Sequence, residues 1–300
     1  MENNTCAVVV TYNRAELLQQ CIVFLLQQNH PCDILIVDNA STDNTADIVK
    51  GFNDPRIVYY NTGENIGGAG GFNFGIKKAV ESKYEYVWVM DDDTFAQPDT
   101  LEQFFIADEK LNGNYGWLSS KALWTDGTIC EMNRQVALSR KSITDFSPEL
   151  IPARSASFVS MFFRAAVIRE VGLPIKEFFI WADDVEYSLR ISRSHQCFVV
   201  SKSTVVHAMG SNLATDYVKL SVDRLPRAFY AARNRFYIQR REGIIGLCRY
   251  GKRFLLDFIK ILLKASDHKF KRLYILIKGL IAGLFFFPGI EFVQKDEFKG

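Results

Sequence analysis

The chain has 300 residues, of which 48% are hydrophobic and 23% charged, a balance that suits one large globular domain or one domain with an appendage. The formal net charge of +2 is too small to indicate nucleic-acid binding by itself, and we expect no nucleic-acid partner. Six scattered cysteines without a CxxC pair argue against a zinc cluster or a disulfide scaffold and suit a reducing compartment. The N-terminal segment MENNTCAVVV lacks the basic region and long apolar run of a signal peptide.

The first ninety residues alternate between short apolar, β-rich runs and segments with helical spacing. Strands are predicted at residues 6–10, 33–37, 56–60 and 86–90, and helices at 15–28, from about 45 to about 50, and from a glycine-rich stretch to about 82. Four alternations with short connections indicate an α/β fold, a parallel sheet with helices on both faces. Ligands bind such sheets at the carboxyl ends of the strands.

Polar groups follow three of these strands. They are the tripeptide TYN at 11–13, the dipeptide DN at 38–39, and the run DDD at 91–93. Because the carboxyl ends of parallel strands meet at one edge of the sheet, we expect these groups to converge on one crevice. The first half of the chain is therefore predicted to be a nucleotide-binding half-domain.

The three aspartates 91–93 directly follow the apolar run YVWVM. Like charges this close repel and raise each other's pKa, so a counter-ion is needed to make the cluster stable. A hard divalent cation such as Mg²⁺ or Mn²⁺ takes oxygen ligands and bridges to phosphates. A metal that neutralises a diphosphate is the favoured interpretation; the alternative is a strand-end turn with solvated acids.

The glycine-rich stretch NTGENIGGAGGF spans residues 61–72. It does not directly follow the first strand, as a dinucleotide-binding GxGxxG would, and no GK[ST] follows it as in a Walker A loop. Glycines there allow the backbone to approach a ligand closely, or they form a flexible surface loop.

The middle of the chain, about residues 116–207, is less regular. Strands are predicted at 158–164 and 197–200, followed by a separate apolar run at 205–207 that ends in His207. The segment FFIWADDVEY, 178–187, places Asp183 and Asp184 at the start of a helix that runs to about residue 194. A carboxylate free of metal can act as a general base, although Asp is also a favoured N-cap. A single histidine such as His207 is more often structural than a ligand.

The last eighty residues differ in character, and we divide the chain into residues 1–222, a catalytic domain, and 223–300, a C-terminal helical region. A helix rich in Tyr, Phe and Arg is predicted at 225–241, and an amphipathic helix at 251–265 whose polar face includes Asp257. Residues 273–290 are strongly apolar but contain Lys278 and Pro288, so a membrane span there is marginal. An amphipathic segment on an anionic membrane surface is expected; a packed helical appendage or a dimer contact are the alternatives.

Five motifs in this order resemble glycosyltransferase family 2, the inverting enzymes of GT-A fold. They are VVTYNR, LIVDNASTDNT, NIGGAGGF, the DDD run, and WADDVEY, and the resemblance covers roughly residues 5–210. Within the family the pattern is most similar to the bacterial galactofuranosyltransferases. The nearby rhamnosyltransferases share much of it, including a segment like YAARNRFY at 230–237. One departure is Ala182, which separates Trp181 from Asp183 where the galactofuranosyltransferase motif usually has WDD.

The resemblance implies a Rossmann-like, mixed but mainly parallel sheet flanked by helices, and it implies residues that bind the nucleotide-sugar donor. Thr11, Tyr12 and Arg14 are implied to line the nucleotide pocket, and Asp38 to hydrogen-bond the base. Asn65, Gly67 and Gly68 are implied to lie near the ribose or the donor sugar. The implied donor-binding residues are Thr11, Tyr12, Arg14, Asp38, Asn65, Gly67, Gly68, Asp91 and Asp92.

The resemblance also implies the metal and catalytic residues. Asp91 and Asp93 form the metal-binding pair, and His207 completes the metal shell, since the galactofuranosyltransferases have a histidine about two dozen residues after the base. Asp184 is implied to be the general base with Asp183 beside it. Trp181 and Glu186 are implied to shape the acceptor site.

The expected function is a metal-dependent inverting transfer from UDP-galactofuranose, with Mn²⁺ or Mg²⁺, to a lipid-linked oligosaccharide or polysaccharide acceptor. This would serve bacterial cell-surface glycan synthesis, such as lipopolysaccharide O-antigen or capsule, at the cytoplasmic face of the plasma membrane. A rhamnosyltransferase using dTDP-rhamnose is the first alternative. A sugar nucleotidyltransferase and a non-catalytic glycan-binding scaffold are alternatives from other classes, and a homo-oligomer stays open.

Overall fold

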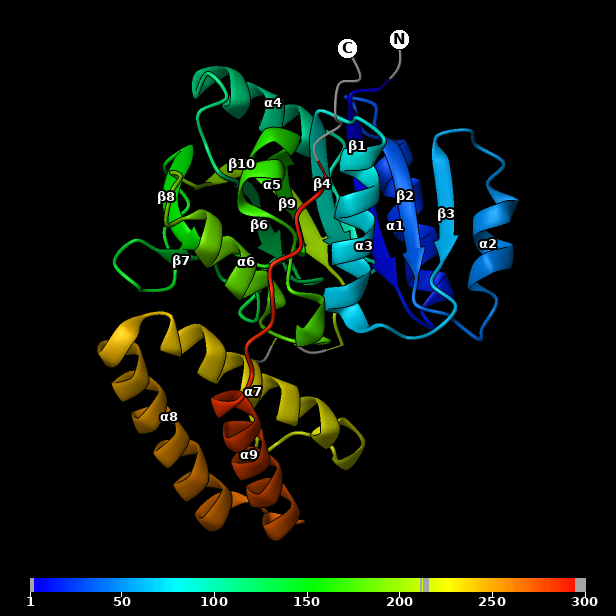
Figure 1. Cartoon of the computed structure of the whole chain (residues 1–300). Coiled ribbons are helices and arrows are strands. Elements are labelled where there is room, and N and C mark those ends of the chain that lie inside the picture. Colours follow the sequence, from blue (N-terminus) through cyan, green and yellow to red (C-terminus); the bar gives the residue numbers. More distant parts are fainter. Residues whose placement is uncertain (1–2, 211, 213–215, 295–300) are drawn as a thin grey trace.

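A ten-stranded mixed sheet forms the centre of the protein (Figure 1), which is described here from a computed structural model of residues 3–210, 212 and 216–294. The outermost residues of the predicted N-terminal segment and C-terminal region lie outside these ranges. The strand order is β3-β2-β1-β4-β9-β6-β10-β8-β7, with β5 paired to β10.

The N-terminal half contains the four predicted parallel strands and the three helices between them. These are β1 (Thr5–Thr11), α1 (Ala15–Leu26), β2 (Asp33–Asp38), α2 (Thr45–Gly51), β3 (Ile57–Asn61), α3 (Gly67–Glu81) and β4 (Tyr86–Asp91). All seven residues of β1 are buried, because Val8 and Val10 face α3 on one side of the sheet while Ala7 and Val9 face α1 on the other. Burial on both faces explains why these strands are continuously apolar in the sequence.

The second half of the glycine-rich stretch, residues 67–72, is the start of a helix and not a loop before one, which corrects the predicted boundary. Helix α3 begins at Gly67 and lies directly against β1. A Cβ on Gly75 would lie 2.4 Å from Val8 Cγ1, and one on Gly71 would lie 2.6 Å from Val10 Cγ1. At least two of these glycines are therefore required for close packing of a helix on a strand, a role that the sequence pattern does not distinguish from ligand binding.

The second half of the sheet was only partly predicted. Its elements are β5 (Thr94–Ala96), α4 (Thr100–Lys110), β6 (Leu118–Leu123), β7 (Val136–Ala137), β8 (Leu150–Ser155), β9 (Met161–Arg164), α5 (Ala165–Val171), α6 (Asp183–Ile191) and β10 (Phe198–His207). Strand β9 lies antiparallel between β4 and β6, and β6 is parallel to β10. The predicted runs at 197–200 and 205–207 are parts of the single strand β10, which is interrupted by a register shift between Val200 and Thr204.

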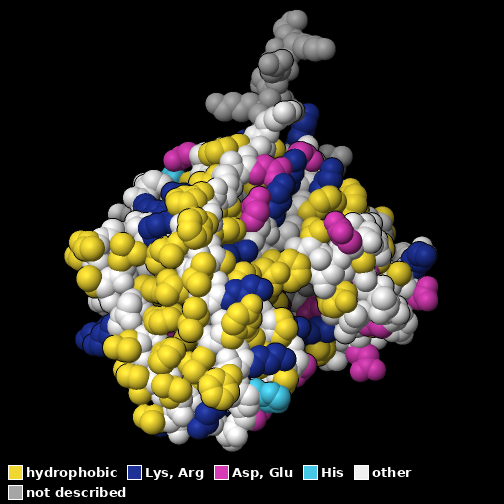
Figure 2. All heavy atoms as spheres, turned by 60° about the horizontal axis from the view of Figure 1, so that its bottom comes forward, with side chains coloured by type: hydrophobic (Ala, Val, Ile, Leu, Met, Phe, Trp, Pro, Cys, Tyr) yellow, Lys and Arg dark blue, Asp and Glu magenta, His cyan; other side chains and the backbone are white. Residues whose placement is uncertain are grey.

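The C-terminal region is a group of three helices at one end of the sheet (Figure 1): α7 (Leu225–Arg240), α8 (Gly243–Lys264) and α9 (Lys269–Leu284). Helix α8 begins eight residues before the predicted 251–265 segment. Its outward side and that of α9 carry many exposed apolar side chains (Figure 2). None of the helices in the described residues combines the length and apolarity that a membrane span requires.

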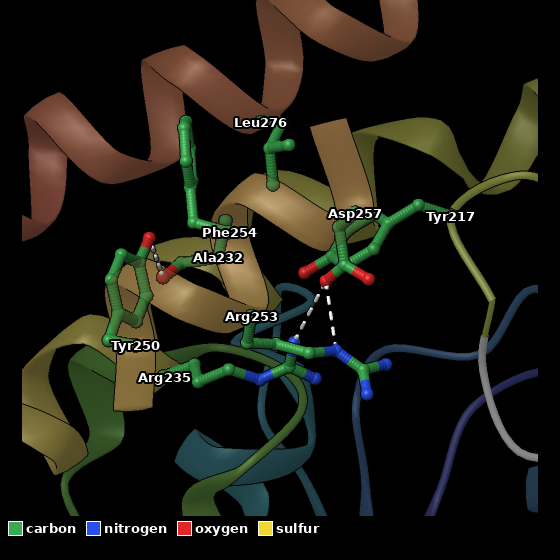
Figure 3. A pocket seen from close by; sticks show the side chains of 8 residues that line it. All are labelled: Tyr217, Ala232, Arg235, Tyr250, Arg253, Phe254, Asp257 and Leu276. Carbon is green, nitrogen blue, oxygen red and sulfur yellow. Dashed lines mark hydrogen bonds and ion pairs between the residues drawn. The ribbon is translucent and has the colours of Figure 1, made fainter. Parts of the chain in front are cut away.

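Asp257 is buried between these helices and does not lie on the polar face where the sequence placed it (Figure 3). Its Oδ2 lies 3.1 Å from Arg253 Nε and 3.6 Å from Arg235 Nη1. Tyr250, beside them, points its hydroxyl at the Ala232 carbonyl oxygen. The cavity that they line has a volume of about 10 Å³, so this cluster holds α7 and α8 together and leaves no room for a ligand.

The chain after α9 returns to the half of the molecule that holds the sheet (Figure 1). Arg240 donates to the Phe286 carbonyl oxygen, and the Phe286 ring contacts Phe178. Glu291 then forms ion pairs with Lys77 and Lys176. The apolar run 273–290 is thus divided between a helix and an extended segment that packs on the sheet's own helices.

Replacing Gly75 by Ala is expected to lower the free energy of unfolding by about 1–3 kcal/mol, since the added Cβ overlaps Val8 in a well-packed interface. Urea unfolding measures the change. Gly68→Ala is the matched control in the same helix, because a Cβ there meets nothing within 4 Å. The control should be neutral or stabilising by up to about 1 kcal/mol; equal losses in both variants would contradict the packing explanation.

Candidate active site

The polar groups at the ends of β1 and β4 meet, as the sequence predicts. Thr11 Oγ1 donates to Asp92 Oδ2 at 2.7 Å. The Arg14 guanidinium, from the turn after β1, lies 3.2 Å from Asp92 Oδ1 and 2.7 Å from Asp93 Oδ2. The β1 and β4 ends are therefore joined by a cation that offsets part of the repulsion between the aspartates.

The three aspartates differ in environment. Burial and the charge of Asp93 raise the pKa of Asp91 to about 7, although 41% of the Asp91 side chain is open to solvent at the site. Burial raises the pKa of Asp92 to about 6, against the opposing effect of Arg14. Burial also acts to raise the pKa of Asp93, but its hydrogen bond and charge interaction with His207 and the charge of Arg14 lower that pKa below the ordinary value.

His207 joins this cluster because β5 and β10 pair antiparallel. His207 lies opposite Thr94 in the ladder, and the Ala208 amide donates to the Asp93 carbonyl oxygen at 2.8 Å. The imidazole Nε2 is 2.9 Å from Asp93 Oδ1 and 4.0 Å from Asp91 Oδ2. Ligand atoms of Asp91, Asp93 and His207 all lie within 4.8 Å of one another, a spacing that suits one metal ion.

Asn133 orients the His207 ring and was not identified from the sequence. Its Oδ1, which can only accept, is 2.9 Å from His207 Nδ1, so Nδ1 carries a proton. The Asn133 amide in turn donates to Ser157 Oγ at 3.1 Å. This arrangement turns Nε2 toward the carboxylates and is the usual support for a metal-binding imidazole.

The loops after β1 and β2 form a second wall of the site. Both Asp38 carboxylate oxygens accept hydrogen bonds, from the Ser41 amide at 2.8 Å and the Tyr59 hydroxyl at 2.6 Å. Asp43 accepts from the Ala15 amide, at the start of α1, which ties the two loops together. Tyr12 is exposed at the rim. The residues predicted for the nucleotide pocket thus lie on two mutually braced loops.

The start of α3 forms the next part of the wall. Asn65 Oδ1 accepts from the Gly67 amide at 2.9 Å, and the Asn39 side chain donates to the Gly67 carbonyl oxygen at 3.2 Å. Gly67 has φ +74°, and a Cβ there would lie 2.1 Å from the Phe179 carbonyl oxygen. Gly68, in contrast, faces open space. Glycine is required at position 67 so that the loop before α6 can lie against the start of α3.

Asp183 and Asp184 begin helix α6, as predicted, behind a loop with unusual backbone geometry. Three residues in the segment 179–182 have φ between +62° and +69°, namely Phe179, Trp181 and Ala182. Asp184 Oδ1 accepts from the Val185 amide at 2.7 Å, and the Phe158 amide also donates to this carboxylate. Non-glycine residues held in the left-handed region are strained and gather at functional sites.

Asp183 is buried and Asp184 is half-buried, and the pair is electrostatically linked to the aspartate cluster. Burial raises the pKa of Asp184 to about 6. Burial, the charge of Asp184 and, more weakly, that of Asp91 raise the pKa of Asp183 well above its ordinary value.

The two residues predicted to shape the acceptor site, Trp181 and Glu186, lie in different surroundings. Trp181 packs against the apolar cluster of the C-terminal helices. Glu186 is buried and paired with Arg190 at 3.0 Å, and Arg190 also donates to the Val171 and Leu173 carbonyl oxygens. Trp181 is therefore in contact with the helical region, whereas the Glu186 carboxylate is engaged inside the domain.

The similarity to known proteins follows this geometry. Residues 6–113, which contain β1 to α4 and the aspartate cluster, match the family model Glycosyl transferase family 2. The protein is a glycosyltransferase with a family 2 domain at residues 6–113. It is 25% identical over 284 residues to the galactofuranosyltransferase GlfT1 of Mycolicibacterium smegmatis, covering 84% of this chain and 90% of that protein. It is 27% identical over 263 residues to GlfT1 of Mycobacterium tuberculosis, covering 81% and 84%.

Solved structures share the fold of this glycosyltransferase. S. aureus TarS 1–349 has a TM-score of 0.56 at 18% identity, covering 95% of this chain and 72% of that one. The mannosyltransferase PcManGT from Pyrobaculum calidifontis has a TM-score of 0.53 at 17% identity, covering 94% and 74%. The predicted GT-A class, a mainly parallel α/β sheet with C-terminal helices, is thereby confirmed.

Replacing Asp93 by Asn is expected to return the pKa of His207 from about 10 toward its ordinary value or below it. Burial disfavours the imidazolium, and the hydrogen bond and charge of Asp93 are the main effects that raise the pKa. Because the folded-state pKa lies above the unfolded value of about 6.5, protonated His207 stabilises the fold below that pH. This contribution is lost as the pH rises through about 10.

Nitrogen-15 NMR of the imidazoles across this range measures the shift in metal-free protein. The imidazole signals of His30, His195 and His268, which do not contact Asp93, are internal controls and should be the same in the wild type and the Asp93→Asn variant. A His207 pKa that stays near 10 in the variant would rule out the Asp93 ion pair as its cause.

Proposed function

We propose that the protein is a divalent-metal-dependent, inverting galactofuranosyltransferase that uses UDP-galactofuranose and a lipid-linked or polysaccharide acceptor of the bacterial cell surface. The observation that carries the proposal is the convergence of Asp91, Asp93 and His207 with the carboxylate pair Asp183–Asp184 at one edge of the sheet. Similarity to two proteins named galactofuranosyltransferase, over more than four fifths of the chain, supports the choice of donor sugar.

The three candidate metal ligands fit Mn²⁺ or Mg²⁺. Two carboxylates are the oxygen ligands that these hard cations prefer, and the imidazole Nε2, oriented by Asn133, would be the third donor. A bound metal would supply charge that stabilises the leaving diphosphate. PcManGT, a protein of the same fold, was solved in complex with GDP-Man and Mn²⁺.

The chain's own residues have distinct roles in this proposal. Arg14 and Thr11 hold Asp92 at the donor phosphates, and the braced loops with Tyr12 and Asp38 hold the nucleoside. Asn65, Gly67 and Gly68 at the start of α3 lie toward the ribose or donor sugar. TarS 1–349, of the same fold, was solved in complex with UDP.

Asp184 is proposed to take the proton from an acceptor hydroxyl, which then attacks the anomeric carbon from the face opposite the diphosphate. A pKa of about 6 leaves it ionised at neutral pH but basic enough to accept a proton. Burial and the charge of Asp184 raise the pKa of Asp183 beside it, which disfavours a second charge in the pair. No covalent intermediate on the enzyme is required.

A rhamnosyltransferase is the second candidate. The segment YAARNRFY at 230–237 resembles that group, and Ala182 interrupts the contiguous WDD that is usual in the galactofuranosyltransferases. Both reactions would use the same metal and base residues, so donor choice alone separates them.

The first test offers UDP-galactofuranose and dTDP-rhamnose separately, with Mn²⁺ and a membrane-lipid fraction as acceptor, and measures nucleoside diphosphate release. We expect release from UDP-galactofuranose that a chelator abolishes. Asp184→Asn should lower kcat by about 10²–10⁴-fold with donor affinity nearly unchanged. Asp99→Asn, at the distant start of α4, is the matched control and should keep wild-type turnover.

Three results would count against parts of this proposal. Near-normal turnover of Asp184→Asn would refute the base assignment. Release from dTDP-rhamnose alone would move the enzyme to the second candidate, and pyrophosphate as product would indicate a nucleotidyltransferase.

We further propose that α8 and α9 rest on an anionic membrane surface, so that the enzyme acts at the cytoplasmic face of the plasma membrane. Exposed apolar residues recur at helical spacing along both helices, and Figure 2 shows them gathered on one side of this end of the molecule. They include Leu255, Leu256, Ile259, Leu262 and Leu263 of α8 and Phe270, Tyr274, Ile277, Ile281 and Leu284 of α9.

The charge of this surface suits anionic lipid. Within residues 243–284, all of which the structure describes, seven exposed side chains are basic and one, Asp267, is acidic. The basic ones are Lys252, Arg253, Lys260, Lys264, Lys269, Lys271 and Lys278. Each Lys or Arg near such a surface contributes about 1 kcal/mol of attraction, which adds to the burial of apolar side chains.

Replacing both Leu263 and Phe270 by Glu is expected to lower binding to anionic vesicles at least about tenfold. These side chains are 75% and 89% exposed, so the change removes about 1.5–3 kcal/mol of apolar burial per residue while scarcely affecting the fold. Vesicle flotation measures the loss. Ile106→Glu on α4, at the opposite end of the molecule, is the control; wild-type flotation of the double variant would refute the membrane surface.

A further inference from the structure

We infer that Asn234 of helix α7 is a positioning residue that holds the loop before the Asp183–Asp184 pair in its active shape. The inference rests on the proposed function of this pair as the catalytic carboxylates. It assigns a role in catalysis to the C-terminal helical region, which otherwise lies outside the sheet and its crevice.

The amide of Asn234 contacts three backbone carbonyls of one loop. Its Nδ2 is 3.0 Å from the Phe178 oxygen, 3.3 Å from the Ile180 oxygen and 2.9 Å from the Trp181 oxygen. Its Oδ1 accepts from Arg233 Nε at 3.0 Å, which fixes the orientation of the amide. Asn234 is 0% exposed, so water cannot replace these hydrogen bonds if the side chain is lost.

The loop needs such restraint because its backbone is strained. Phe179, Trp181 and Ala182 all have positive φ, and non-glycine residues keep this geometry only where their surroundings enforce it. Ala182 is the residue directly before α6, so its conformation sets where the helix begins. A change in the loop would therefore move both carboxylates relative to Asp91 and Asp93.

Two helices clamp the loop from opposite sides. On one side, the Ala69 amide of α3 donates to the Phe179 carbonyl oxygen, an approach that only glycine at position 67 permits. On the other side, Tyr230 stacks on Phe179 with ring centroids 4.9 Å apart. Tyr230 and Asn234 are four residues apart and share one face of α7. The carbonyl oxygens of residues 178, 180 and 181 thus accept hydrogen bonds from the Asn234 amide. A carboxylate at position 234, as in an Asn234→Asp variant, has no such donor and would repel these oxygens.

The test compares Asn234→Leu and Asn234→Asp with Gln28→Leu. Gln28 is the matched control because it is also buried and donates to two carbonyls, those of Phe24 and Gln97, but it joins α1 to the segment before α4. The Asn234 variants should lower kcat about 100-fold, with the donor KM and Mn²⁺ affinity changed less than about threefold. The control should lose a similar amount of thermal stability but keep kcat within about threefold.

Hydrogen–deuterium exchange gives a readout that needs no turnover. Peptides covering residues 178–186 should exchange at least about tenfold faster in Asn234→Leu than in the wild type, and at the wild-type rate in the control. If the wild type transfers no sugar from any donor, the proposed function fails while exchange still tests the restraint. If Asn234→Leu does not fold, Asn234→Ser, which keeps one donor, should show smaller changes of the same kind.

Several results would overturn the inference. One is kcat within about threefold of wild type in a folded Asn234 variant. Others are an equal loss of kcat in Gln28→Leu, a rise in donor KM that matches the fall in kcat, or unchanged exchange over residues 178–186.

Discussion

Crowded negative charge at the carboxyl edge of the sheet is the constraint on which the rest of this structure depends. Five carboxylates, at positions 91–93 and 183–184, lie where a parallel sheet directs its strand ends. Arg14 and His207 neutralise part of this charge, and burial raises the pKa of the remainder, which leaves a site that favours a divalent cation. The repulsion between these charges is opposed by the packing of strands β1, β4 and β10, whose buried side chains hold the strand ends in place.

The second constraint is the loop between the sheet and the C-terminal helices. Phe179 to Ala182 adopt backbone geometry that they would not hold alone, and they are restrained by α3 on one side and α7 on the other. The extended segment after α9 strengthens this connection, since Phe286 contacts Phe178 and Glu291 pairs with Lys77. The helical region is thus part of the architecture of the site. Trp181 of this loop packs against an apolar cluster to which α8 and α9 contribute, so the helices of the proposed membrane surface also contact the loop.

Local sequence pattern identified what depends on neighbours along the chain. The four parallel strands are continuous apolar runs, the helices between them have regular spacing, and the acidic residues directly follow strands or begin a helix. Asn133 and Asn234 carried no such signal. Asn133 lies far from His207 in sequence, and Asn234 stands among the aromatic and basic residues of α7. The glycines of α3 were identified in the sequence, but the pattern does not distinguish a glycine needed for helix packing from one that lets a ligand approach the backbone.

Short-range periodicity and residue chemistry were enough to predict the α/β class and an acidic site at the strand ends, because both depend on neighbours along the chain. The roles of the candidate metal and base carboxylates came from the resemblance of the motifs to family 2 glycosyltransferases. Only the tertiary structure decided that β9 runs antiparallel between β4 and β6, that His207 meets Asp93 through the β5–β10 pairing, and that Asp257 is buried. It also decided that Glu186 is engaged by Arg190 and that Asn234 holds the loop before Asp183. These are contacts between segments tens of residues apart, and their formation depends on how the whole chain packs, which no local pattern encodes.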